Sequence, residues 1–356
     1  MVDWKRAVAT AARLIQPGPP VSATEARSAV RSLRALAEVA DAHVRELTQL
    51  TPTRSTPPAR VVDRPTWVEA NARGMDALLT PVVSQLRARA AKHAKKEPGK
   101  VATAVGARVT GVQAGVVLAF LASKVLGQFE IFNQPGGELL LVAPNVIEAE
   151  RSLGVDPGDF RLWVCLHEGT HRLQFMAVPW LDGYLRERVG ALIDSIDLDP
   201  KVVGARLKFA VGELAKAARG DESGEGLLAL IQGERSRAIM DEITAIMSLV
   251  EGHAEYVMDA VGPDVVPSVA SIRAKFDHRR QGSGPLDRLV RRLLGLDVKM
   301  RQYAEGGAFV KQVVAKVGMT GFNVVWTSPE TLPRRAELTD PDAWIKRVHP
   351  HHVTGG

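Results

Sequence analysis

The chain has 356 residues, of which 46% are hydrophobic and 24% are charged, values ordinary for a globular protein. Its net charge of +6 comes from 46 Lys and Arg residues against 40 Asp and Glu residues. Because the basic residues are spread out and form no concentrated face, we expect no nucleic-acid partner. The single cysteine, Cys165, excludes an intrachain disulfide, and the N-terminus has no apolar segment of signal-peptide length, so we expect a cytoplasmic location.

Helices are predicted over most of the N-terminal region. Apolar residues recur at every third or fourth position from Asp3 to about Leu50, in two helices of which the second is capped by Ser22. Residues 51–59 are rich in Pro, Thr and Ser and predict a linker. Beyond it, Pro65 suits the first turn of a third helix.

The middle of the chain predicts a core helix followed by a β-hairpin. Residues 87–100 are rich in Lys and Arg, which we interpret as a solvated helix face and loop. The apolar stretch Val109–Leu126 contains a lysine, a glutamine and glycines, so it predicts a buried core helix and no membrane partner. Two short apolar runs, Gln128–Phe132 and Glu138–Val142, flank a Pro-Gly-Gly turn and predict the hairpin. The predicted class is therefore mainly α (α+β).

A capped helix is predicted from Asp156 to about Met176. Asp156 can accept a hydrogen bond at the N-cap, Pro157 fits the first turn, and Asp159 stands where a capping-box partner would. The helix contains the pattern His-Glu-x-x-His. Its glycine, Gly169, costs about 1 kcal/mol relative to alanine inside a helix, so we expect a close packing contact there.

The pattern places His167 and His171 four residues apart, on one face of the helix and about 6 Å apart along its axis. Two imidazoles so placed can bind one zinc ion at about 2.0–2.1 Å. Glu168 points to a neighbouring side of the helix, where it can take a proton from a metal-activated water without being a ligand. The alternative is a pair of structural histidines held by hydrogen bonds.

A third ligand is expected from a second helix, predicted for Ala238–Ala260. Glu251 borders its apolar stripe, and a buried carboxylate needs a cation. Glu255, one turn later, could accept a hydrogen bond from the outer nitrogen of a ligand histidine. His253 is a rival third ligand, but it faces away from Glu251, so we expect it to contact substrate or a neighbouring helix.

The chain resembles the gluzincin metallopeptidases in having His167-Glu-x-x-His171 followed some eighty residues later by Glu251-Gly-x-Ala-Glu255. More narrowly, it is similar to an actinobacterial family of zinc-dependent metalloprotease-like hydrolases, in the branch labelled coenzyme F-420 biosynthesis-associated. The segments that carry this resemblance are Val2–Trp4, Val61–Trp67, Val125–Gln128, Leu141–Asn145, Phe160–Glu168, Val178–Leu181, Leu294–Tyr303 and Pro329–Pro333.

The resemblance implies a zincin-like core with a small β-element and extra N-terminal helices. It implies that Zn²⁺ is bound by His167, His171 and Glu251, with Glu168 as general base and Glu255 orienting a histidine. For the oxyanion, His253, Tyr256, Tyr184 and Tyr303 stay open as candidates. We predict an N-terminal helical region over 1–100 and a metal-binding catalytic region over 101–356, packed as one unit.

The predicted function is hydrolysis of peptide or other amide bonds by metal-activated water. A peptide substrate would then add to the edge of strand Glu138–Val142. The alternative is a non-catalytic, zinc-containing helical binding or scaffold protein linked to a cofactor pathway, although a site with three protein ligands argues against purely structural zinc. A third reading, nucleic-acid binding, rests on Arg288, Arg291 and Arg292. The sequence leaves the oligomeric state open.

Overall fold

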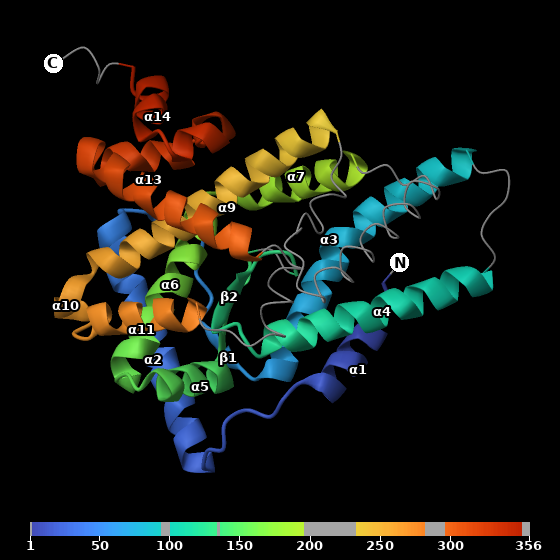
Figure 1. The fold of residues 1–356 in the computed structure, drawn as a ribbon, viewed down its shortest axis with the longest axis horizontal. Helices are drawn as coiled ribbons and strands as arrows, with labels where there is room; N and C mark the ends of the chain where they lie inside the picture. Colours follow the sequence, from blue (N-terminus) through green and yellow to red (C-terminus); the bar gives the residue numbers. More distant parts are fainter. Residues whose placement is uncertain (1, 94–99, 134–135, 196–232, 282–295, 351–356) are drawn as a thin grey trace. The chain divides into compact units, whose positions relative to one another are not determined.

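The structure, a computed structural model, describes residues 2–93, 100–133, 136–195, 233–281 and 296–350. Most of these residues are helical, and a small three-stranded sheet accompanies the helices, which confirms the mainly α class (Figure 1). The chain divides into two compact units. The first comprises Met1–Asp182 and Val257–Ile272, and the second comprises Gly183–Tyr256 and Arg273–Gly356.

The first unit holds the sheet and the N-terminal helices. Its complete elements are α1 (Trp4–Leu14), α2 (Ala23–Thr48), β1 (Arg60–Val62), α3 (Arg64–His93), α4 (Lys100–Ala122), β2 (Gly127–Glu130), β3 (Glu138–Val142), α5 (Ala143–Leu153), α6 (Pro157–Ala177) and α10 (Gly262–Val265). Three more helices begin in one unit and end in the other: α7 (Leu181–Ser195), α9 (Glu234–Ala260) and α11 (Val269–Gln281).

The sheet has the order β1-β3-β2, with β3 in the centre. Strands β2 and β3 are antiparallel, with Glu130 opposite Glu138, which confirms the predicted hairpin. Strand β1 pairs in parallel with β3 and was not predicted, because three residues are too few for a period-two pattern. Since β3 is paired on both sides, the expectation that a substrate adds to the edge of Glu138–Val142 is wrong.

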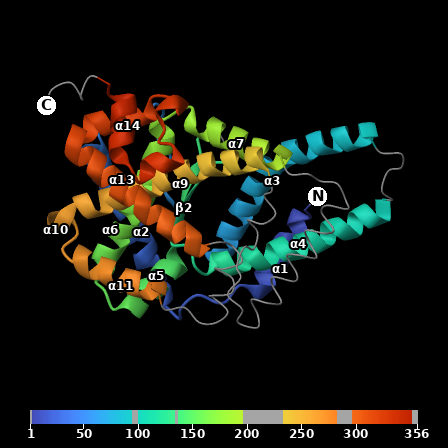
Figure 2. The same cartoon turned by 45° about the horizontal axis from the view of Figure 1, so that its top comes forward.

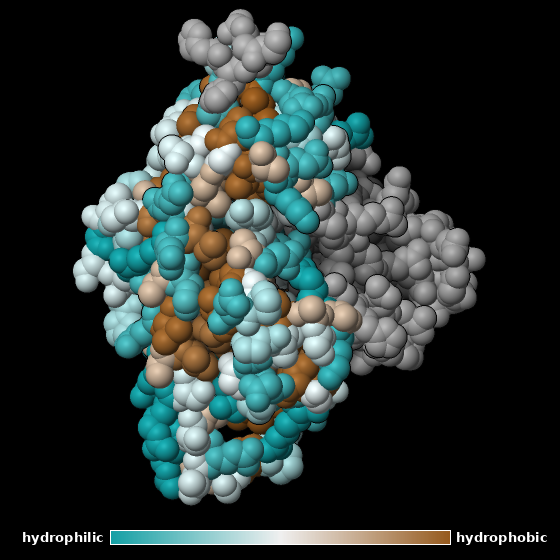
Figure 3. All heavy atoms as spheres, turned by 90° about the vertical axis from the view of Figure 1, so that its left-hand side faces the viewer, coloured by the Kyte–Doolittle hydropathy of each residue, from teal (hydrophilic) through white to brown (hydrophobic). Residues whose placement is uncertain are grey.

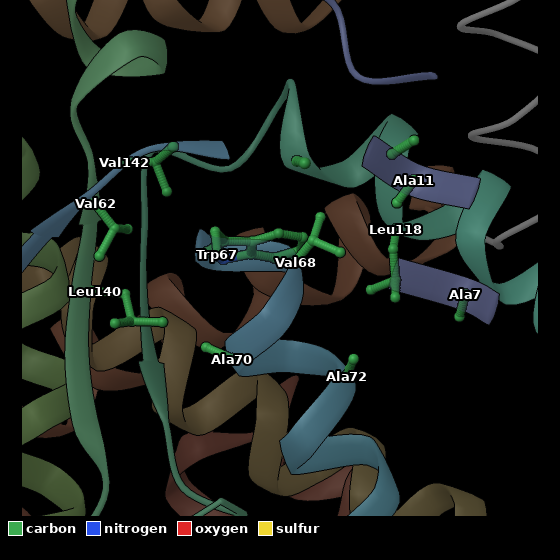
Figure 4. Close-up of a cluster of buried hydrophobic side chains, with 12 residues drawn as sticks. Ala7, Ala11, Val62, Trp67, Val68, Ala70, Ala72, Leu118, Leu140 and Val142 are labelled. Carbon is green, nitrogen blue, oxygen red and sulfur yellow. The ribbon is translucent and has the colours of Figure 1, made fainter. Parts of the chain in front are cut away.

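The first core of this unit forms between α1, α3, α4 and the sheet. Trp67 and Val68 of α3 lie between Leu140 and Val142 of the sheet and the helix pair α1–α4 (Figure 4). Helix α1 lies along α4, where an added Cβ at Gly115 would stand 2.5 Å from the Ala7 carbonyl oxygen. The two backbones can therefore approach closely because α4 carries glycine there.

Only one side of α4 is buried in this way. Leu118, Ala119 and Ala122 are buried, whereas Val109 and Val116 are about half exposed, at 51% and 48%. The prediction of a buried core helix over Val109–Leu126 therefore holds for one side of α4 and is wrong for the other, and the helix ends at Ala122. None of the described helices is both long and apolar enough to pass through a membrane. In Figure 3, hydrophilic side chains are interspersed among the hydrophobic ones on the face shown.

The predicted capping of α6 is confirmed. The Asp156 side chain accepts a hydrogen bond from the Asp159 N–H at 2.9 Å, and Pro157 occupies the first turn. The Asp159 carboxylate accepts a hydrogen bond from the Ser268 N–H at 2.8 Å instead of completing a capping box, and this contact ties the start of α6 to the segment before α11. The helix is thus anchored at its N-terminus both locally and by a distant segment.

Helix α6 packs against α2 and against strand β2. At Gly169 an added Cβ would stand 3.8 Å from Val44 of α2, an ordinary van der Waals distance. The expectation of an unusually close contact at Gly169 is therefore wrong. Phe175 of α6 stacks on Phe129 of β2 with ring centroids 5.9 Å apart, which joins the helix to the edge of the sheet.

The second unit is built on α7, α9 and α13, with a folded C-terminal segment. Its complete elements are α13 (Leu296–Phe322), η2 (Asn323–Trp326), η3 (Pro329–Thr331), η4 (Arg335–Leu338) and α14 (Pro341–Val348). Helices α9 and α13 cross in close contact, as Figure 2 also shows: a Cβ at Gly306 would lie 1.9 Å from the Ser248 carbonyl oxygen. Glycine is required at that crossing because any side chain would overlap the backbone of α9.

The C-terminal segment is part of a core of the second unit. Trp344 of α14 is fully buried against Phe309 of α13, with ring centroids 5.7 Å apart, and its indole N–H donates to the Thr331 carbonyl. Arg347 adds a bidentate ion pair with Glu337, at 2.7 Å for each contact.

Several predictions concern residues outside the described ranges. They are Arg288, Arg291 and Arg292, on which the nucleic-acid reading rests, and the side chains of the basic run 87–100. The division at residue 100 stays a prediction. Within the first unit, α1 packs on α4 and β1 pairs with β3, so residues on both sides of that position share one core.

Candidate metal centre

The two motif histidines face each other on α6. The Nε2 atoms of His167 and His171 are 3.1 Å apart, and the rings are almost perpendicular, at 85°. His171 is buried, with 9% of its surface exposed, and His167 is partly buried. The i, i+4 spacing of the motif therefore brings both ring nitrogens to one point, as predicted.

The outer nitrogens of both rings meet hydrogen-bond acceptors. Nδ1 of His171 lies 3.0 Å from Oε1 of Gln174, and Nδ1 of His167 lies 3.2 Å from Sδ of Met258, at the end of α9 and within the first unit. An amide oxygen and a thioether sulfur accept hydrogen bonds and cannot donate them. These contacts are satisfied by the tautomer that has its hydrogen on Nδ1, and in that tautomer the two Nε2 atoms direct their lone pairs toward each other.

This arrangement fits a divalent metal. Two lone pairs 3.1 Å apart repel each other unless a positive charge lies between them, which a metal ion or a shared proton would supply. Two nitrogen ligands of one tetrahedral zinc ion, each at about 2.0–2.1 Å, are about 3.3 Å apart. The distance between His167 and His171 is close to that value, so these two residues could hold zinc without moving far.

Glu168 lies beside the histidines and against the first residue of β2. It is 7% exposed, and an added Cβ at Gly127 would stand 2.6 Å from Cγ and 2.8 Å from Cδ of Glu168. The carboxylate is therefore held between α6 and the edge strand of the sheet. A residue held in this way is suited to act as a general base, because its position relative to the neighbouring histidines is restricted.

Cys165, the sole cysteine, is suited neither to bind a metal nor to act as a nucleophile. Cys165 is fully buried one turn before Glu168, and burial raises the pKa of its thiol to about 12, with a further rise from the Glu168 carboxylate that Arg172 opposes. Metal binding and nucleophilic attack both need a thiolate. The thiol instead lies 3.8 Å from the Leu33 carbonyl of α2, as a packing residue.

The remaining candidates lie on α9 in the second unit. Glu251, Glu255 and Tyr256 are partly buried. Glu255 lies beside Gly307 of α13, where an added Cβ would be 3.0 Å from Oε2 of Glu255. Both histidine outer nitrogens have contacts within the first unit, and the role of Glu255 as their acceptor stays a prediction, as does the ligand role of Glu251.

His253 lies in the hydrophobic core of the second unit. It is 0% exposed, and its ring centroid is 5.2 Å from that of Phe322 and 5.6 Å from that of Trp326. Of the roles predicted for His253, contact with a neighbouring helix matches this position, because Phe322 ends α13.

The tyrosines proposed for the oxyanion are separate cases. Burial raises the pKa of Tyr184, with a further rise from Glu242 that Arg188 opposes, so its phenol stays protonated and able to donate a hydrogen bond. Tyr256 is partly buried on α9, and the side chain of Tyr303 lies outside the described residues. The oxyanion role stays a prediction for all three.

Sequence reasoning missed three residues of this centre: Gln174, Met258 and Gly127. Gln174 could have been found, because it follows His171 by three positions and so lies on the same helix face. Met258 and Gly127 come from distant segments, and no pattern in the sequence marks them as neighbours of the motif.

The comparisons with known proteins agree with this geometry. The chain matches the model of a family described as zincin-like metallopeptidase over residues 2–345. It is also similar to a solved structure from Chloroflexus aurantiacus, described as a presumed hydrolase with a novel fold. The two share 30% identity over 98% of each chain, with a TM-score of 0.69. Among curated proteins, none matches the chain.

Proposed function

We propose, because this chain belongs to the zincin-like metallopeptidase family, that it is a zinc-dependent hydrolase that cleaves peptide or other amide bonds. The observation that carries the proposal is the pair of Nε2 atoms of His167 and His171, 3.1 Å apart, with both outer nitrogens facing acceptors. The buried Glu168 next to this pair supplies the general base. Family membership supports a metal, typically zinc, and hydrolytic chemistry.

Glu251 is the proposed third ligand. Helix α9 is continuous from Glu234 to Ala260, and its last turns bring Met258 to His167 within the first unit. Glu251 precedes Met258 by seven residues, which is two turns, so both project from the same side of α9 and about 10 Å apart along its axis. In this proposal Glu251 and the two histidines are the three protein ligands of one metal ion.

The roles of zinc and of Glu168 in the reaction follow from these positions. A bound zinc ion would lower the pKa of a coordinated water and polarise the substrate carbonyl. Glu168 would take the proton from the attacking water and pass it to the leaving nitrogen. Three protein ligands leave a coordination position for that water, whereas structural zinc sites are usually closed by four.

A peptide substrate would lie along β2 rather than β3. Strand β2 is at the edge of the sheet, and its first residue, Gly127, touches Glu168. An extended peptide that added to this edge would run past the general base, and its backbone would hydrogen-bond to the strand. The substrate cannot instead add to β3, because β1 and β2 pair with both of its sides.

We also propose that the chain belongs to the actinobacterial branch labelled coenzyme F-420 biosynthesis-associated. This narrower placement rests on the sequence segments given above.

The competing function is a zinc-containing binding or scaffold protein with no catalysis. Zinc content by mass spectrometry, combined with cleavage of a peptide library, tests both. Stoichiometric zinc with cleavage supports the hydrolase, zinc without cleavage supports the scaffold, and a wild-type protein that does not bind zinc contradicts both.

A further inference from the structure

Gln174 contacts His171, one of the proposed zinc ligands. Gln174 is 0% exposed, and its Oε1 lies 3.0 Å from Nδ1 of His171. Both residues belong to α6, three positions apart, so a helix already anchored at its N-terminus by Asp156 and Asp159 holds the contact. We infer that Gln174 is a positioning residue that fixes the tautomer and ring orientation of His171, an inference that rests on the proposed zinc function.

The chemistry of the amide oxygen determines which tautomer is selected. An oxygen that can only accept requires the hydrogen on Nδ1, which leaves the lone pair of Nε2 directed at His167. A histidine without such a partner exchanges between two tautomers, one of which places a hydrogen where the metal must bind. Gln174 therefore holds His171 in the tautomer that can bind a metal before the metal is bound.

An uncharged acceptor suits this position. The buried neighbourhood already contains the Glu168 carboxylate, and Arg172, the basic residue that follows His171, is 5% exposed and bonded to Asp41 of α2 at 3.0 Å. A glutamate at 174 would add a second buried negative charge to α6, which a metal ion would offset. The amide accepts from the ring without adding a charge, so the His171–Gln174 contact itself needs no metal ion to offset it.

Three variants of the full-length protein test the inference. Gln174→Leu removes the acceptor, and Gln174→Glu keeps an acceptor oxygen. Thr170→Val is a matched control, because Thr170 is also 0% exposed on α6 and its hydroxyl donates to the Leu166 carbonyl at 2.7 Å. Zinc affinity is measured by competition with a chromophoric chelator. The tautomer of His171 is read from ¹⁵N chemical shifts of the metal-free protein at pH 8.5.

In the metal-free wild type, we expect His171 to be protonated at Nδ1 and bare at Nε2. We expect Gln174→Leu to shift His171 toward the Nε2–H tautomer and to weaken zinc binding by about 10–100-fold, the usual effect of losing such a partner. Gln174→Glu should restore most of the affinity, and Thr170→Val should leave both the tautomer and the affinity unchanged.

Two results would overturn the inference: a wild-type His171 protonated at Nε2, or a Gln174→Leu protein whose affinity and tautomer match those of Thr170→Val. Because the tautomer is read without metal, its outcome is separate from the fate of the proposed function. A wild type that shows the Nδ1–H tautomer but binds no zinc would contradict the zinc proposal and leave the orienting role of Gln174 intact.

Discussion

Gly127 and Glu168 touch across the boundary between the edge strand and the metal-motif helix, so closely that a methyl group on Gly127 would stand 2.6 Å from Cγ of Glu168. The two residues are 41 positions apart in the chain. Their contact aligns the edge of the sheet with the proposed general base, and it makes Gly127 a sensitive position for testing the site.

Replacing Gly127 with alanine should displace Glu168 and reduce hydrolysis by about 10²-fold, because misplacing a catalytic group by about 1 Å has effects of that size. Zinc content should be unchanged, since the atoms nearest to the new methyl group all belong to Glu168. Gly169→Ala is the matched control: its Cβ would meet only Val44 at 3.8 Å, and it should add up to about 1 kcal/mol of stability. Equal activity of the two variants would contradict the proposed role of the contact.

Replacing Glu168 with glutamine should retain zinc and reduce kcat by at least about 10²-fold, the usual contribution of a general base. The two side chains have nearly the same shape, so folding should be little affected. Kinetics on a cleaved library peptide, together with zinc analysis of the same sample, provide the measurement. A fully active Glu168→Gln protein would remove Glu168 from the mechanism.

Replacing Glu251 with glutamine should weaken zinc binding by several orders of magnitude if its carboxylate is the third ligand, since a charged donor is lost. The control is Glu242→Gln, an exposed residue on the same helix that forms a surface ion pair with Arg188. Chelator competition measures both affinities. Zinc affinity that is the same in both variants would exclude Glu251 from the metal site.

The helix crossing in the second unit predicts a large loss of stability for Gly306→Ala. The new Cβ would lie 1.9 Å from the Ser248 carbonyl oxygen, so α9 and α13 must separate, at a cost of at least about 1–3 kcal/mol. Gly190→Ala in α7, where no atom lies within 4 Å, should instead stabilise by up to about 1 kcal/mol. Denaturant unfolding of both variants tests the crossing, and a stable Gly306→Ala protein would rule it out.

Cys165 predicts a loss of stability at alkaline pH. Its pKa is about 12 in the folded protein and 9.0 in the reference state, so between these values the unfolded chain releases a proton that the native state keeps. Stability should therefore fall as pH rises above 9, by up to about 1.4 kcal/mol per pH unit for this one group. Cys165→Ala should show a shallower decline over the same range.

Labelling gives a second measurement of the same property. Iodoacetamide at pH 8.5 should modify Cys165 only after the protein is unfolded, because the buried thiol is protonated and inaccessible. Rapid labelling of the native protein would contradict both the burial of the Cys165 thiol and its raised pKa.

The sequence by itself determined the features that depend on neighbours within one helix. Asp156 and Pro157 mark the start of α6, and the i, i+4 spacing of His167 and His171 brings their Nε2 atoms together, because side chains on a helix repeat every 3.6 residues. The same local logic would have identified Gln174. Hydrophobic runs around a Pro-Gly-Gly turn were likewise enough to predict the β2–β3 hairpin.

Only the tertiary structure decided the relations between distant segments. It showed β3 at the centre of the sheet, placed Gly127 against Glu168 and Met258 against His167, and put His253 in a core beside Phe322. Such contacts arise when elements pack to bury apolar surface, and many pairings of the same elements bury similar amounts. The pattern along the chain therefore specifies which face of an element is apolar, but the packing decides which residues of another element that face meets.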